Sequence, residues 1–401
     1  MVTRNSDEPA LGRRSFLRSA ALLATAAPIV TEASLAHAAQ TAAPPSGMAL
    51  HGQSPNAPPS GAVLINANEN PLGPSKAACD AIVRVAPLGG RYDLNGETDM
   101  LVQTFAAQTG LKPENVVAYA GVLAFTSPTK SFVTADPSYE AGMYAAKTSQ
   151  AKVVKVPLTK DCAHDVKAMV AADAQAGVIY ICNPNNPTGT VTTKQDIVWA
   201  LENKPAGSIL LVDEAYIHLT DEPDTLDLVA QGKDLIVLRT FSKIYGMAGI
   251  RCGFAVGRPD LLAKLKPFGQ NAMPITGSAA ARASLEDASL VPERRKIIGD
   301  TRRDTIAWLK TNGYKVIGDP QTNCFMIDTG RNGKAVFAAM KAKNVLIGRT
   351  WPIWPNAVRV SVGTPEEMAA FKVAFKAVMD AKPMALGDHV QHAELDYYAI
   401  L

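Results

Sequence analysis

The sequence of 401 residues is poor in several features that would point to particular classes of protein. Its five cysteines are scattered without the paired spacing of a metal site, and an odd number argues against a disulfide framework. Aromatic residues make up only 6%, and a formal net charge of +3 gives no reason to expect a nucleic-acid partner. After residue 39, no apolar run reaches the roughly 18 residues of a membrane span. What is left is an ordinary globular chain, long enough for two domains.

The first 39 residues have the pattern of an export signal. Gly12-Arg-Arg-Ser-Phe-Leu-Arg18 is a twin-arginine motif, and an Ala- and Leu-rich run over 20–30 follows it. Ala36-His-Ala38 fits a small-x-small cleavage site, although a basic amphipathic helix is the alternative interpretation. We therefore expect residues 1–39 to be a twin-arginine signal peptide and the mature protein to be periplasmic in a bacterium. Residues 40–60, rich in Pro, Ala, Ser and Gly, predict a disordered linker.

The most informative stretch runs from Thr240 to Arg251. The apolar run 235–238 before it predicts a short buried strand. Lys243 then lies at the carboxyl end of that strand, which is where open α/β sheets bind ligands. An amine in this position can form a Schiff base with an aldehyde cofactor, whereas a lone lysine after a strand is more often simply solvated. The hydroxyls of Thr240 and Ser242 and the guanidinium of Arg251 would suit a phosphate.

Two upstream apolar runs also end in polar side chains. The run 178–181 leads into Cys182-Asn-Pro-Asn-Asn-Pro-Thr-Gly189, and the run 208–212 leads into Asp213-Glu-Ala-Tyr216. A buried carboxylate can hold the proton of a pyridine nitrogen. An amide and a phenol can hold an oxygen on the same ring. Three successive strands therefore end in Asn, in Asp with Tyr, and in Lys.

Together these motifs resemble those of fold-type I pyridoxal-phosphate enzymes, namely the class I/II aminotransferases, and the pattern is most similar to the histidinol-phosphate aminotransferase group. The resemblance extends from about Ala62 to about Met379. It implies pyridoxal 5′-phosphate as the cofactor and small amino and oxo acids as substrates. The implied reaction transfers an amino group between an amino acid, or a histidinol-phosphate-like amine, and a 2-oxo acid. Decarboxylation or elimination on the same fold is the runner-up.

The resemblance also implies a role for each matching residue. Lys243 would carry the cofactor and move the substrate proton, Asp213 would hold the ring nitrogen, and Asn186 and Tyr216 would hold the ring oxygen. The residues implied for the phosphate and for stacking on the ring are Thr240, Ser242, Arg251, Gly121 and Tyr139. Tyr92 would reach the phosphate of the neighbouring subunit, which implies a twofold homodimer.

Four residues are implied for the substrate. Arg359, in the last strand, would clamp the α-carboxylate, because a guanidinium fork matches a carboxylate in a bidentate way. Asn323 and Asn70 would lie near the same place, Asn70 in a segment that crosses the mouth of the site. Arg349 would receive a distal anion. Trp351 and Trp354 beside it depart from the commoner pattern and leave the distal specificity open.

Alternating strand and helix patterns predict an α/β fold, with a large domain built on a mostly parallel seven-stranded sheet flanked by helices. After residue 273 the pattern changes to charged helices and short strands, which predicts a small α+β domain. We expect the following division after the linker: an N-terminal segment packing with the small domain (61–90), the large domain (91–273), the small domain (274–381) and a tail (382–401).

The segment after Gly121 departs from the family pattern. Only nine residues separate Gly121 from the strand that begins at Ser131, and a crossover normally takes at least ~10–12. We expect a stunted helix or an irregular loop at 121–130, and a phosphate site that lacks backbone donors. Weak cofactor binding would follow, so a relative with impaired or absent activity is a further alternative.

Overall fold

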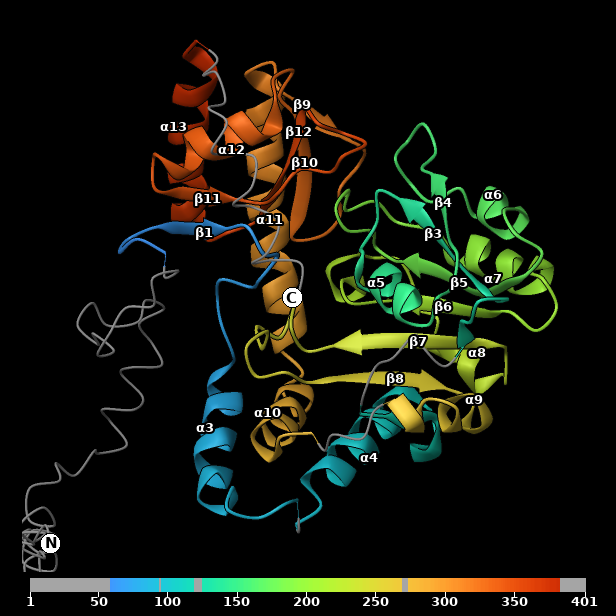
Figure 1. Ribbon diagram of the computed structural model, residues 1–401. Coiled ribbons are helices and arrows are strands. Elements are labelled where there is room, and N and C mark those ends of the chain that lie inside the picture. The colour runs from blue at the N-terminus through green and yellow to red at the C-terminus, as the bar shows by residue number, and fades with distance from the viewer. Residues whose placement is uncertain (1–57, 94, 119–124, 269–272, 383–401) are drawn as a thin grey trace, which may run out of the picture. The chain divides into compact units, whose positions relative to one another are not determined.

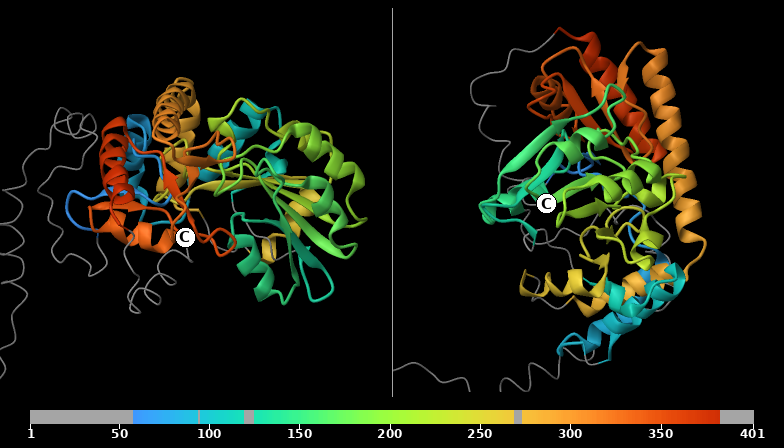
Figure 2. Two further views of the ribbon diagram at one scale, coloured as in Figure 1. Left: turned by 90° about the horizontal axis from the view of Figure 1, so that it is seen from above. Right: turned by 90° about the vertical axis from the view of Figure 1, so that its right-hand side faces the viewer.

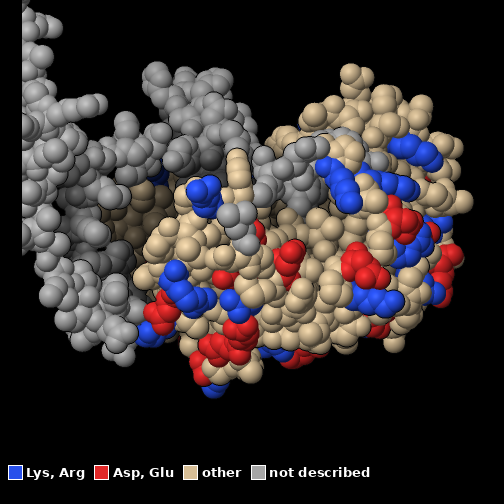
Figure 3. All heavy atoms as spheres, turned by 90° about the horizontal axis from the view of Figure 1, so that it is seen from below, with Lys and Arg blue, Asp and Glu red and all other residues tan. Residues whose placement is uncertain are grey.

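The computed structural model describes residues 58–93, 95–118, 125–268 and 273–382. The expected signal peptide, most of the linker, Gly121 and nearly all of the C-terminal tail lie outside these ranges. None of the described helices is both long and apolar enough to cross a membrane. On the face shown in Figure 3, the basic and acidic side chains of the described residues are interspersed, without a large area of one sign.

A seven-stranded sheet forms the centre of the large part of the molecule (Figure 1). Its strands, from one edge to the other, are β2 (Val116–Val117), β8 (Gly253–Gly257), β7 (Leu235–Thr240), β6 (Ile209–Asp213), β5 (Ala176–Cys182), β3 (Ser131–Asp136) and β4 (Val153–Pro157). Strand β8 alone runs opposite to the other six strands. The predicted mostly parallel sheet is therefore confirmed. Because β5 and β6 are buried along their whole length, their sequences are continuous apolar runs rather than alternating ones.

Helices cover both faces of this sheet (Figure 2). On one face Ile179 and Leu210 belong to the core that also contains residues of α4 (Glu97–Thr109), α6 (Val166–Ala171), α7 (Lys194–Asn203) and α8 (Leu226–Ala230). The adjacent strand residues Val178 and Leu211 point to the other face, in the core shared with α5 (Ala141–Thr148) and α9 (Pro259–Ala263). Side chains of a strand alternate between faces, so both layers are filled by the same two strands.

The C-terminal part of the chain forms a smaller sheet. Its antiparallel strands are β12 (Ala357–Ser361), β10 (Cys324–Asp328) and β9 (Lys315–Ile317), and its helices are α11 (Leu290–Thr311), α12 (Gly333–Lys341) and α13 (Pro365–Asp380). Helix α13 begins with a capping box, in which Thr364 and Glu367 each satisfy the other's backbone amide.

The N-terminal segment contacts two different regions. Strand β1 (Val63–Ile65) pairs in parallel with β11 (Val345–Ile347) of the C-terminal part. Helix α3 (Lys76–Val85), which Ser75 caps, instead packs against α10 (Ile275–Glu286) (Figure 1). The domain boundaries given above stay a prediction.

The described part of the segment 121–130 contains no α-helix. Ser127 and Lys130 exchange two backbone hydrogen bonds of 3.1 and 3.0 Å, so the chain makes a tight turn directly before β3. The expectation of an irregular loop is met by residues 125–130, whereas Gly121 and residues 122–124 lie outside the described residues. Reduced cofactor binding stays a prediction.

Gly189, the last residue of the Asn-Pro-Thr-Gly motif, joins the two sheets. Its φ is +71°, and a Cβ at this position would lie 2.7 Å from the carbonyl oxygen of Cys324 in β10. Its own carbonyl accepts a 2.8 Å hydrogen bond from the amide of Gln321. Only glycine allows the loop after β5 to lie this close to the segment that leads into β10. The motif therefore sets where the small sheet meets the large one.

We expect Gly189→Ala to lower the free energy of unfolding by about 2 kcal/mol or more, from left-handed strain together with the clash. Gly207→Ala is the matched control, because Gly207 has a φ of +76° but no atom within 4 Å of an added Cβ. It should show the strain alone, about 1 kcal/mol. Urea unfolding of both variants measures the difference. Equal losses would show that the contact with Cys324 constrains nothing.

Candidate active site

Lys243 lies three residues beyond the end of β7, closely surrounded by protein atoms. Its Nζ is 5.4 Å from the centre of the Tyr216 ring. Burial, together with the positive charge of Arg359, lowers the pKa of Lys243 to about 8, although acidic groups such as Asp213 oppose the shift. A much larger fraction of this amine is therefore neutral near pH 7 than of an exposed lysine. A neutral amine can attack a carbonyl.

Asp213 ends strand β6 and lies between Cys182 of β5 and Leu238 of β7 in the sheet register. Its Oδ2 accepts a 2.8 Å hydrogen bond from the Tyr180 hydroxyl, and its Oδ1 accepts one of 3.1 Å from the amide of Ala215. Burial raises the pKa of Asp213, and these two donors hold the rise in check. A carboxylate has further lone pairs, so it can still accept a proton donor from a ligand.

Tyr180 was missed by the sequence reasoning. It occupies an apolar strand, where the hydroxyl of a buried tyrosine normally needs a hydrogen-bond partner. A tyrosine within a buried apolar strand could therefore have indicated a polar partner nearby.

Asn68 was also missed, and it connects the predicted ring-oxygen residues. Its Nδ2 donates to the Tyr216 hydroxyl at 3.1 Å and lies 3.4 Å from Oδ1 of Asn186. The Ser361 hydroxyl donates to Oδ1 of Asn68 at 2.9 Å and accepts from its backbone amide at 2.8 Å. Asn68 has a φ of 54°, a conformation that asparagine adopts more readily than most residues. The structure therefore brings Asn186 and Tyr216 together through a residue of the N-terminal segment.

Arg359 is buried beside these residues. Its Nη1 donates to Oδ1 of Asn186 at 2.8 Å, and its Nη2 donates to the carbonyl oxygen of Asn66 at 2.6 Å. Its Nε has no hydrogen-bond partner among the described residues and lies against Gly348, where an added Cβ would come within 2.9 Å of it. Asn323, the residue before β10, donates from Nδ2 to the carbonyl oxygen of Asn68, and its Oδ1 has no partner among the described residues. Nη1 and Nη2 each keep a second hydrogen, so the buried guanidinium can still donate to a ligand oxygen.

The predicted phosphate residues gather at the end of β7. The Thr240 hydroxyl donates to Ser242 Oγ at 2.8 Å, and the amide of Ser242 donates to Thr240 Oγ1 at 3.1 Å. The amide of Phe241 donates to the carbonyl oxygen of Cys252, which places Arg251 next to this turn. Arg251 is exposed and has a φ of 63°. Two hydroxyls and one solvent-facing guanidinium thus share one end of the strand.

The remaining predicted residues fall in three places. Tyr139 lies within the site: burial raises the pKa of its phenol, Asp213 adds to the rise, and Arg251 and Arg359 oppose it. Asn70 uses its side chain on the backbone, donating to the carbonyl oxygen of Ile244 at 2.8 Å, so it supports the turn after Lys243. Tyr92 is 88% exposed and does not reach the site of its own chain.

Arg349 forms an ion pair with Glu140, the residue that precedes α5. Its guanidinium lies over the ring of Trp351, 4.4 Å from the centroid, and that of Arg359 lies 5.5 Å from the same centroid. Trp351 is only 2% exposed. The predicted distal residue and the predicted α-carboxylate residue therefore flank one aromatic ring.

A model of the family described as aminotransferase class I and II matches residues 114–374, more than half of the chain. The chain belongs to the class I and II aminotransferases. The expectation of a pyridoxal-phosphate-dependent enzyme that transfers amino groups is confirmed at this level.

Relatives and solved structures agree with this assignment. The chain is 34% identical to an aromatic amino acid aminotransferase of Rhodococcus jostii, over 82% of the chain and 94% of the relative. It is 32% identical to a histidinol-phosphate aminotransferase of Moorella thermoacetica, over 79% and 85%. The crystal structure of a putative histidinol-phosphate aminotransferase from Erwinia carotovora atroseptica has a TM-score of 0.75, with 30% identity over 79% of this chain and 95% of that one.

The described residues of this aminotransferase fit pyridoxal 5′-phosphate. A histidinol-phosphate aminotransferase of Sinorhizobium meliloti, 25% identical over 79% of this chain and 90% of that one, was solved in complex with it, with a TM-score of 0.73. In this chain an amine of lowered pKa, a buried carboxylate and a group of phosphate donors lie at the ends of adjacent parallel strands. Lys243 would hold the aldehyde, Asp213 the ring nitrogen, and Thr240, Ser242 and Arg251 the phosphate.

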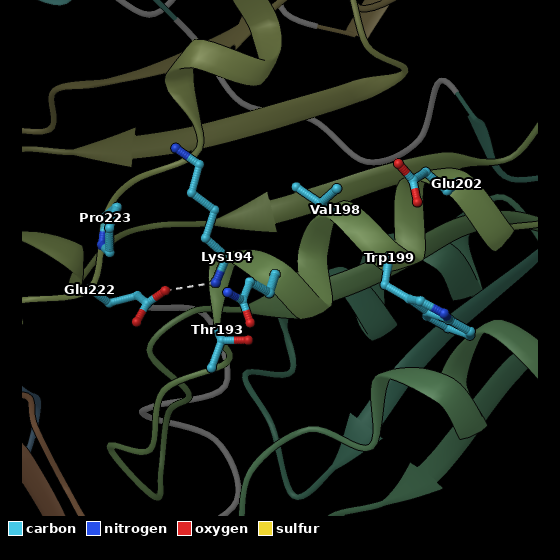
Figure 4. Close-up of a pocket in the computed structure, with 8 residues that line it drawn as sticks. Thr193, Lys194, Val198, Trp199, Glu202, Glu222 and Pro223 are labelled. Carbon is cyan, nitrogen blue, oxygen red and sulfur yellow. Dashed lines mark hydrogen bonds between the residues drawn. The ribbon is translucent and has the colours of Figure 1, made fainter.

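The described residues also enclose a hollow of about 710 Å³ on α7, unrelated to this site (Figure 4). It is lined by Thr193, Lys194, Gln195, Val198, Trp199, Glu202, Glu222 and Pro223. Glu222 accepts a 2.7 Å hydrogen bond from the backbone amide of Lys194 there. None of the predicted site residues lines this hollow, and its side chains offer no pairing of a nucleophile with a base.

We expect the amine of Lys243 to titrate near pH 8, so its reactivity should rise through that pH. An exposed lysine should instead rise near pH 10.4. Reductive methylation of the cofactor-free protein with formaldehyde, quantified by mass spectrometry of the Lys243 peptide, measures this. Arg359→Gln should move the midpoint upward, because it removes a positive charge that lowers the pKa. A midpoint close to 10 in the unaltered protein would contradict the assignment.

Proposed function

We propose that this aminotransferase moves the amino group of an amino acid with an aromatic or imidazole side chain to a 2-oxo acid. The observation that carries the proposal is the convergence of Lys243, Asp213 and Arg359 at one edge of the large sheet. The two sheets contribute different parts of the site, since Arg359 comes from β12 and the other two follow β7 and β6. A substrate held by Arg359 is therefore brought to the amine of Lys243.

Bound pyridoxal 5′-phosphate would supply an aldehyde and an electron sink. Lys243 would hold that aldehyde, and its amine is placed to take the proton from the substrate α-carbon. Asp213 would hold the proton of the ring nitrogen, and Tyr180 fixes the orientation of the Asp213 carboxylate. Arg359 would bind the α-carboxylate through Nη1 and Nη2, each of which carries a second hydrogen beyond the one given to Asn186 or Asn66.

The donor class is supported from two directions. Relatives of the chain include aromatic amino acid aminotransferases and histidinol-phosphate aminotransferases. In the chain itself, Trp351 lies against Arg359, and Trp354 is half-buried on the same tight turn. The surroundings of the carboxylate clamp are therefore partly aromatic.

A donor panel tests the proposed function. The donors are phenylalanine, tyrosine, histidine, histidinol phosphate, alanine and glutamate. The acceptor is 2-oxoglutarate, except that glutamate is paired with pyruvate. Both products of each reaction are identified. We expect equal amounts of the new oxo product and of the aminated acceptor, with the highest kcat/KM for an aromatic or imidazole donor. Release of carbon dioxide or ammonia in place of these products would show a decarboxylase or lyase. Absence of products with every donor while the cofactor stays bound would overturn the proposal.

The proposed assembly is a twofold homodimer in which Tyr92 binds the cofactor phosphate of the partner subunit. Tyr92 is 88% exposed, and Val83 of α3 and Leu88 of the following turn are exposed as well. Three large exposed apolar or aromatic side chains within this one segment support the proposal that it forms part of an interface.

Subunit mixing tests this arrangement. We expect Tyr92→Phe and Lys243→Ala homodimers each to retain cofactor poorly or to be inactive. A mixed dimer should regain one site in which Lys243 and Tyr92 are both present, and so about half of the activity of the normal dimer per dimer. Sedimentation velocity checks that the variants still associate. No recovery on mixing would contradict a shared site.

Export to the periplasm is proposed from the twin-arginine motif alone. Replacement of Arg13 and Arg14 by Lys should retain the full-length protein in the cytoplasmic fraction of expressing cells.

A further inference from the structure

An ion pair between Arg349 and Glu140 lies near Arg359. Arg349 lies two residues after β11, and its guanidinium pairs with the carboxylate of Glu140, 209 positions away in the chain. The Arg349 side chain is 45% exposed and that of Glu140 is 19% exposed. The pair therefore lies at a solvent-facing rim, where an incoming ligand can reach it.

The Glu140 side chain is not used by its own helix. Glu140 is the N-cap residue of α5, but its φ of −94° and ψ of −10° are helical and its side chain makes no capping bond. The carboxylate is therefore available to Arg349, with which it forms the ion pair.

The Trp351 ring connects this pair to the carboxylate clamp. Arg349 and Arg359 lie 4.4 and 5.5 Å from its centroid, so the two guanidinium groups are near neighbours. A substrate whose α-carboxylate sits on Arg359 would therefore place the far end of its side chain near the pair of Arg349 and Glu140.

We propose that Glu140 is a specificity-determining residue, which occupies Arg349 and makes the pocket select donors with neutral aromatic side chains. Such a side chain leaves the ion pair intact. A donor with a distal carboxylate or phosphate reaches Arg349 only by displacing Glu140, and it meets that carboxylate as a like charge. The inference rests on the proposed amino transfer and narrows its substrate class.

Binding of unreactive substrate analogues tests the inference without turnover. 3-Phenylpropionate has a neutral aromatic tail, and glutarate has a distal carboxylate. Calorimetric titration of the cofactor-loaded enzyme gives both dissociation constants. We expect Glu140→Gln to tighten glutarate binding about fivefold, because a partly exposed ion pair contributes a free energy of about that size. Binding of 3-phenylpropionate should change less than twofold. The ratio of kcat/KM for glutamate to that for phenylalanine should rise by a similar factor.

Two further variants identify the cause. Glu286→Gln removes the same charge from an ion pair on α10, away from the site, and should leave both dissociation constants unchanged. Arg349→Ala combined with Glu140→Gln should lose the gain for glutarate, because the freed guanidinium is then missing. Retained 3-phenylpropionate binding shows in every variant that the pocket is folded.

Unchanged glutarate affinity in Glu140→Gln would overturn the inference, and so would an equal change for both analogues. Failure of the proposed function is a separate result. It would appear as no amino transfer from any donor, while the two analogue affinities still decide the role of Glu140.

Discussion

The burial of the Arg359 guanidinium is the constraint on which the site depends. A charge removed from water must be surrounded by hydrogen-bond acceptors, or the fold loses several kcal/mol. Asn186 supplies one acceptor from the loop after β5, and Asn66 supplies another from the N-terminal segment. Three stretches of chain that are far apart in the sequence are thereby held at one point. The same positive charge helps to lower the pKa of Lys243, so the proposed substrate clamp would also prepare the proposed nucleophile.

The large sheet makes this arrangement possible because its central strands are parallel. The carboxyl ends of parallel strands lie at one edge of the sheet. Polar side chains that follow different strands therefore come together there, although they are far apart in the sequence. Asp213 lies beside Cys182 and Leu238 in the register, directly between the strands that carry the asparagine and the lysine. The strands themselves are apolar and buried, so they form a rigid support for polar groups at their ends. Gly189 allows the small sheet to pack closely against this edge, and Arg359 of β12 then lies beside it.

The motifs around Lys243, Asp213 and Asn186 could be predicted because each combines an apolar run with polar residues at fixed spacing. The seven strands were predictable for the same reason. Asn68, Tyr180 and Glu140 were not found. Their partners lie 148, 33 and 209 positions away, and no local pattern records a contact at such a distance. Asn68 is one of three asparagines in a short segment, Asn66, Asn68 and Asn70. It has the left-handed conformation, with a φ of 54°, and the sequence does not show which of the three adopts it.

The sequence by itself determined the class of fold and the family, and it predicted the candidate reacting groups, because these follow from hydrophobic periodicity and from side chains placed at the ends of strands. The tertiary structure alone decided how those groups act on one another. The pKa of Lys243 depends on burial and on a guanidinium from another sheet, and the orientation of Asp213 depends on a tyrosine from another strand. The state of Arg349 depends on a glutamate at the start of a helix that belongs to the large part of the molecule. Each of these properties depends on residues that are neighbours in space but distant in the sequence, so the order of residues along the chain does not reveal it.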